Sequence, residues 1–128
     1  MVEVEFNREA SMACALDLRL LNGNVLTEKR IYRYVVFKVN DGRGTERIVI
    51  RVAARNVLVG QVLHNFKTEV QPLEFEMLGG GELTYMPYGT RCIFLQGESP
   101  DIVRESERKI TLGVFKRELP DFHIAELP

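Results

Sequence analysis

The sequence predicts an α+β domain in which two helices pack on a mixed β-sheet, with the approximate order β-β-β-α-β-β-α-β. Two observations predict this class. Short β-branched, aromatic or alternating stretches recur along the chain, most clearly at residues 31–39. Two longer stretches instead repeat apolar residues at helical spacing, near residues 59–66 and 110–115. With 128 residues and no linker or repeat, the chain is expected to form one domain over residues 1–128.

The predicted strands are short stretches of apolar or alternating residues bounded by turn residues. They cover residues 2–6, 12–21, 31–39, 46–52, 74–78, 91–96 and 122–126. The second stretch is ambiguous, because its leucines alternate with Asp17 and Arg19 as in a strand while Ala, Met and Leu are strong helix formers. We favour a strand there. Asn22-Gly23-Asn24 is predicted to form a turn, and residues 41–44 a hairpin loop.

The first predicted helix covers residues 56–67, with Asn56 as its N-cap. Its buried stripe is formed by the apolar residues Val59, Val62, Leu63 and Phe66. His64 falls on the opposite, polar face of this helix.

The second predicted helix covers residues 105–118, and Pro120 ends it. Its apolar residues, expected to face the sheet, are Ile110, Val114 and Phe115. Its charged residues, expected to face water, are Arg104, Glu107, Arg108 and Lys116.

Composition excludes several functional classes. The net charge of −1 argues against nucleic-acid binding, which requires clustered basic residues. No stretch approaches the roughly 20 apolar residues of a membrane helix. The N-terminal residues alternate acidic with apolar and do not resemble a signal peptide, so we expect a cytoplasmic protein.

The two cysteines, Cys14 and Cys92, are far apart in sequence and lie in no metal-binding spacing. Both are therefore expected to be buried thiols. The two histidines, His64 and His123, are remote from the cysteines, and we expect His123 to pack within the last strand. Neither a metal nor a cofactor is expected.

The run Leu78-Gly79-Gly80-Gly81 is the most unusual local feature of the chain. Each glycine costs roughly 0.5–1 kcal/mol relative to alanine inside a regular element. We therefore expect Gly79, Gly80 and Gly81 to take the chain out of a strand, at positions that need positive φ or close backbone approach. A second glycine segment follows one strand later, at Gly97-Glu98-Ser99-Pro100-Asp101.

Together these features resemble the Janus/Ocnus family, whose best-known members are the protein phosphohistidine phosphatases. The resemblance rests on the glycine run, on Gly97-x-Ser99 after a strand, and on Leu119-Pro120-Asp121-Phe122, which resembles the family's Tyr-Pro-Asp-Tyr. The strand Tyr32-Arg33-Tyr34-Val35 resembles the family's opening strand. The features cover roughly half to two-thirds of the chain, and the resemblance implies the same mixed sheet with two helices.

The resemblance also implies a phosphate site with three parts. Arg33 matches the basic residue of the opening strand, where a guanidinium would bind phosphate oxygens in a bidentate fashion. Arg51 is the best match for a second basic residue before the first helix, with Arg47 or Arg55 as alternatives. Ser99 matches the loop whose backbone N–H groups bind the anion.

The 99–101 loop departs from the family pattern. Pro100 has no N–H to donate, and Asp101 places a negative charge where a phosphate would lie. A second reading of these residues is therefore a simple turn that caps the following helix. Each arginine also has a second reading, as a surface cation paired with Glu46 or Glu69.

The largest departure concerns the family's catalytic His, early in the first helix, where this chain has only Val57, Leu58 and Val59. An aliphatic side chain can neither take a proton from water nor accept a phosphoryl group. His64 lies seven residues after Val57, roughly 10 Å further along a helix axis, which is too far for the same role in the same register.

The sequence therefore predicts a phosphohistidine phosphatase-like domain that lacks the catalytic His and binds a phosphorylated protein or peptide or a small anionic ligand. One alternative is an active hydrolase that uses His64 as a re-sited base. The other is a non-catalytic structural or interaction protein. Two geometric observations distinguish these three hypotheses. The first is whether Arg33, Arg51 and the Ser99 loop converge on one site. The second is whether His64 reaches that site.

Overall fold

A computed structural model of the chain describes residues 16–20, 25–40, 42, 44, 46–97 and 99–127. The predicted strand at 2–6, the turn at 22–24 and Cys14 lie outside these residues. The described elements follow the predicted order β-β-β-α-β-β-α-β. The strands are β1 (Leu16–Asp17), β2 (Arg30–Asn40), β3 (Glu46–Ala54), β4 (Phe75–Met86), β5 (Cys92–Gly97) and β6 (His123–Glu126). The helices are α2 (Val59–Val70) and α3 (Arg108–Glu118).

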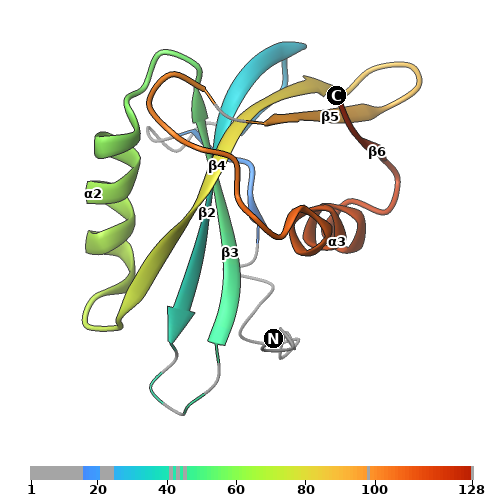
Figure 1. Cartoon of the computed structure of the whole chain (residues 1–128). Helices are drawn as coiled ribbons and strands as arrows, with labels where there is room; N and C mark the ends of the chain where they lie inside the picture. Colours follow the sequence, from blue (N-terminus) through green and yellow to red (C-terminus); the bar gives the residue numbers. More distant parts are fainter. Residues whose placement is uncertain are drawn as a thin grey trace.

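The described strands form one mixed sheet in the order β1-β3-β2-β4-β5-β6 (Figure 1). β1 runs parallel to β3 and β6 runs parallel to β5, whereas the other neighbours are antiparallel. The α+β class is thereby confirmed. The predicted strand at 12–21 is confirmed only for Leu16–Asp17.

The two helices cover opposite faces of the sheet (Figure 1). Side chains alternate along β2, so successive residues join different cores. Val35 and Phe37 pack against α2, where Phe37 stacks on Phe66 at 3.8 Å between ring centroids. Tyr34 packs against α3, edge-on to Phe115. The predicted apolar stripes of both helices therefore face the sheet, as expected.

The glycine run does not leave the strand, and the prediction that it does is wrong. β4 continues from Phe75 to Met86 through all three glycines, and Gly81 pairs with Gly97 of β5. Of the three glycines in the run, only Gly79 has a positive φ, of 139°. A Cβ on Gly79 would lie 2.6 Å from the Glu105 backbone nitrogen, and one on Gly80 would lie 2.1 Å from the Tyr34 carbonyl oxygen. Close approach of other backbone is the physical reason for both glycines.

The glycines mark the place where the β5–α3 connection crosses the edge of the sheet. β5 pairs with β4 only from Gly81 onward, and the Gly80 N–H donates instead to the Val103 carbonyl at 2.9 Å. Just before this contact, Ile102 packs into the α2 core. Just after it, Glu105 accepts a hydrogen bond from the Tyr34 hydroxyl on the α3 face.

Two predictions about helix ends are also wrong. The first helix begins at Val59, and its N-cap residue Leu58 makes no side-chain cap, so Asn56 does not cap it. The second begins at Arg108 rather than at residue 105. Arg108 is buried instead of facing water, because its guanidinium pairs with the buried Glu105 carboxylate at 3.0 Å.

Neither described helix has the length and apolar character needed to cross a membrane.

We predict that Gly80→Ala lowers the free energy of unfolding by about 1–3 kcal/mol, because the added methyl group meets the Tyr34 carbonyl. Gly113→Ala is the matched control: Gly113 lies in α3 with open space around its Cβ position. That variant should be about 0.5–1 kcal/mol more stable than the wild type. Urea unfolding measures both, and equal stabilities for the two variants would contradict the close-approach explanation.

Candidate functional site

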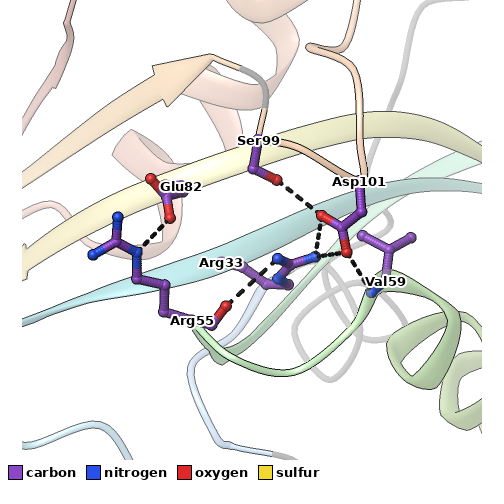
Figure 2. A network of polar contacts seen from close by, with 6 residues as sticks. All are labelled: Arg33, Arg55, Val59, Glu82, Ser99 and Asp101. Atoms are coloured by element: carbon purple, nitrogen blue, oxygen red, sulfur yellow. Dashed lines mark hydrogen bonds and ion pairs between the residues drawn. The ribbon is translucent and has the colours of Figure 1, made fainter.

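The candidate site is centred on the carboxylate of Asp101 (Figure 2). Arg33 Nη1 donates to both carboxylate oxygens, at 2.7 Å and 2.6 Å. The Val59 backbone N–H donates to Oδ2 at 3.0 Å, and the Ser99 hydroxyl donates to Oδ1 at 3.1 Å. Three separate elements, β2, the start of α2 and the 99–102 turn, therefore meet on one anion.

Arg33 reaches this position because of its place in β2. It lies on the same face as Val35 and Phe37, under α2, and its side chain is only 7% exposed. A guanidinium cannot lose its charge in a protein, so its burial requires an anionic partner. Besides Asp101, the Arg55 carbonyl accepts from Arg33 Nη2 at 3.5 Å.

The 99–102 turn holds Asp101 over Arg33. Ser99 and Ile102 exchange two backbone hydrogen bonds, at 3.0 Å and 3.1 Å, which close the turn. The Ile102 side chain is buried in the α2 core and anchors the turn to the sheet. Pro100 and Asp101 remain at the exposed tip. The turn is therefore fixed at its base while the carboxylate points inward.

Asp101 also serves as the missing cap of α2. The first N–H groups of a helix have no partner within the helix and form its positive end. Val59 is the first residue of α2, and its N–H donates to the carboxylate of Asp101, which lies in a turn 42 residues later in the sequence. This contact explains why the helix needs no cap from Asn56 or Leu58.

These contacts lower the pKa of Asp101 from 3.8 to about 2. The hydrogen bond from Arg33 is the largest cause, and the Val59 N–H acts in the same direction, while burial opposes both. Because the folded-state pKa is depressed, the stabilisation from ionised Asp101 is present above about pH 4 and is lost as the pH falls towards 2.

A second ion pair lies beside the first. Glu82 is the cross-strand neighbour of Arg33 in β4, and its Oε2 lies 2.7 Å from Arg55 Nε (Figure 2). The Arg55 side chain is 61% exposed. The site thus has two guanidinium groups and two carboxylates, and its charges compensate one another.

The structure brings together some of the predicted residues. Arg33 and Ser99 converge as expected. Arg55, an alternative for the second basic residue, contacts Arg33 only through its backbone carbonyl, and its guanidinium pairs with Glu82. Arg51 does not converge with Arg33 and Ser99. Its Nε donates to Glu69 at 3.0 Å, and Glu69 lies ten residues beyond Val59, about 15 Å further along α2. For Arg51 the alternative reading is correct in its partner, Glu69, but wrong in its exposure, because Arg51 is buried rather than on the surface.

The other predicted residues lie elsewhere. Arg47 is opposite Val39, near the far end of β2 from Arg33. His64 is exposed on α2, where it and Arg51 of β3 line a separate open depression of about 570 Å³. His123 pairs with Cys92 in the sheet, and Cys92 is buried as predicted. His64 therefore does not reach the Asp101 network.

The arrangement can hold an anion, but the carboxylate at its centre is a poor base. Within the network, a carboxylate with a pKa of about 2 is a poor acceptor for a proton from water at neutral pH. Among the described residues, no group of three or more His, Cys, Asp or Glu side chains could hold a metal ion.

The sequence pattern predicted that the Asp101 carboxylate would oppose anion binding. In the structure this carboxylate itself occupies the position between Arg33, Val59 and Ser99. The available signal was the pairing of Pro100, which removes a backbone donor, with Asp101, which adds a carboxylate at the same loop. Compared with the loop that the resemblance implies, Pro100 lacks an N–H donor for phosphate, and Asp101 supplies a carboxylate that can take the place of phosphate.

In comparisons with known proteins, the chain matches no protein-family model and no curated protein sequence. The family resemblance drawn from its motifs therefore stays a prediction.

We predict that Asp101→Asn lowers the free energy of unfolding by about 1–2 kcal/mol at pH 7, because Arg33 stays buried with a weaker partner. This loss of stability is at the lower end of the range for hydrogen bonds to charged groups, because the Asp101 side chain is 32% exposed and water screens its charge. Asp121→Asn, at an exposed position, is the control and should change stability by less than about 0.5 kcal/mol. Indistinguishable urea midpoints for the two variants would contradict the role assigned to Asp101.

Proposed function

We propose that this chain is a non-catalytic, phosphohistidine phosphatase-like domain that recognises a phosphorylated protein or peptide. The phosphoryl group binds to Arg33, the Val59 N–H and Ser99, and it displaces the Asp101 carboxylate. The observation that carries this proposal is that one carboxylate accepts hydrogen bonds from all three groups.

The chemistry of the donors supports an anionic ligand. A guanidinium and the first N–H of a helix are both common partners of phosphate oxygens in proteins. The hydroxyl of Ser99 adds a neutral donor. The Arg55 side chain is exposed but pairs with Glu82 rather than with Asp101. In the ligand-free chain the same donors bind the Asp101 carboxylate, so a phosphoryl group can use donors that are already in place.

Asp101 makes the site selective. As part of the same chain it competes at an effective concentration that is in the millimolar range for short tethers, so simple anions bind weakly. A successful ligand needs further contacts. Leu58 and Val103, adjacent to Val59 and near Asp101 in sequence, are each 70% exposed and offer apolar contacts to a protein partner. This combination favours a phosphorylated protein or peptide over free phosphate.

The residues at the start of α2 argue against hydrolysis. Where the resemblance places the catalytic His, the chain has Val57, Leu58 and Val59, and the exposed Leu58 side chain cannot transfer a proton. The alternative of His64 as a re-sited base has no support from its position, because it lines a separate depression beside Arg51. If the chain binds no anion at this site, the remaining alternative is a non-catalytic structural or interaction protein.

We predict that removing the internal carboxylate exposes the anion site. Sulfate and phosphate should raise the melting temperature of Asp101→Ala more than that of the wild type, since an anion at 100 times its Kd adds about 2.7 kcal/mol. Adding Arg33→Gln to Asp101→Ala should abolish the anion effect, whereas adding Arg51→Gln should preserve it. Equal anion shifts in Asp101→Ala and the wild type would reject the proposed site.

We also predict that neither the wild type nor Asp101→Ala hydrolyses a phosphohistidine peptide above the buffer rate. The reason is that the positions where the resemblance places the catalytic His are aliphatic, and an Asp101 carboxylate with a pKa of about 2 is a poor proton acceptor. His64→Ala should leave this result unchanged. Turnover that disappears in His64→Ala would overturn the assignment and establish the hydrolase alternative.

A further inference from the structure

Ser99 combines a sequence signal with an unusual position. It is the only serine or threonine of the chain that is followed by proline, which is the residue pair recognised by a broad class of protein kinases. It begins the 99–102 turn, in which Pro100 and Asp101 are exposed. The proposed function uses its hydroxyl only as a donor, so its reactivity as an acceptor of a phosphoryl group is unassigned.

The geometry places this hydroxyl next to an occupied anion site. Ser99 Oγ lies 3.1 Å from Asp101 Oδ1, and the same carboxylate oxygen lies 2.7 Å from Arg33 Nη1. A single oxygen atom therefore separates the hydroxyl from the guanidinium. Figure 2 shows the Ser99 side chain pointing toward the carboxylate that rests on Arg33 and Val59.

We propose that Ser99 is a phosphorylation site and that its phosphate replaces the Asp101 carboxylate on Arg33 and on the N-terminus of α2. In the modification, Ser99 Oγ bonds to the γ-phosphorus of ATP while the bond from that phosphorus to the β-bridging oxygen breaks. ADP leaves, and the hydroxyl proton passes through the base of the kinase to solvent. The inference rests on the proposed function, because it uses the same anion site.

Electrostatics drives the exchange. A phosphoserine carries a charge of about −1.5 to −2 at pH 7 and offers three acceptor oxygens, against one negative charge and two oxygens for Asp101. The two anions repel each other at this distance, and the single positive charge of Arg33 can neutralise only one of them. Asp101 lies at an exposed tip, so water solvates it once it is displaced.

The consequence is a regulated site. In the unmodified chain, Asp101 is an exchangeable occupant that a phosphorylated partner displaces. In the modified chain, the phosphate is tethered through Ser99 and carries more charge than the carboxylate. Phosphorylation of Ser99 therefore closes the site to external phosphoryl groups.

The first test places phosphoserine at position 99 during translation and follows the pKa of its phosphate by ³¹P NMR. Contact with Arg33 should lower this pKa below its ordinary value of about 6. Arg33→Gln should restore the ordinary value, and Arg51→Gln, as the control, should not. A pKa near 6 that is insensitive to Arg33→Gln would overturn the proposal.

The second test separates this inference from the proposed function. Asp101→Ala with an unmodified Ser99 reports whether the site binds sulfate at all. Phosphoserine at position 99 should then abolish the sulfate shift of Asp101→Ala. A sulfate shift that persists after phosphorylation would reject the inference while leaving the proposed function intact.

The modification itself is tested with the folded chain, labelled ATP and kinases that accept serine followed by proline. The wild type should take up label at Ser99, and both Ser99→Ala and Pro100→Ala should lose it. A folded wild-type chain that takes up no label at Ser99 would overturn the assignment of the site.

Discussion

The burial of the Arg33 guanidinium beneath α2 is the constraint on which the rest of the site depends. A permanent cation that is 7% exposed must be neutralised, and Asp101 does so from a turn 68 residues away. The same carboxylate caps α2 and accepts the Ser99 hydroxyl. One anion therefore fixes the position of a strand, a helix and a turn relative to one another.

The glycine run makes this arrangement possible. The connection after β5 must pass from the α2 face, where Asp101 and Ile102 lie, to the α3 face, where Glu105 is buried. It crosses the sheet against Gly79 and Gly80, at positions where a Cβ would collide with backbone. The glycine run of β4 thus accommodates the same connection that carries Ser99 and Asp101 of the candidate site, although the two are distant in sequence.

Sequence patterns predicted what depends on local residues. The alternation and β-branching of residues 31–39 and 46–52, and the apolar stripe of the first helix, were sufficient to place β2, β3 and α2. They could not reveal interactions set by residues far apart. The cap of α2 comes from Asp101, 42 residues from Val59, and the Glu105 carboxylate that pairs with the buried Arg108 accepts a hydrogen bond from Tyr34, 71 residues away. In the site, Arg33 and Ser99 were found from their motifs, but Asp101 was identified as a ligand only from the geometry.

The central claim is that Asp101 is held in its ionised form as the occupant of an anion site. A carbon-detected NMR titration of its side-chain carboxyl group in the folded wild type tests this claim most directly. We expect a pKa of about 2, so that the resonance keeps its ionised position down to about pH 3, and a pKa closer to 4 in Arg33→Gln. An ordinary pKa near 3.8 in the wild type, unchanged by Arg33→Gln, would contradict the account.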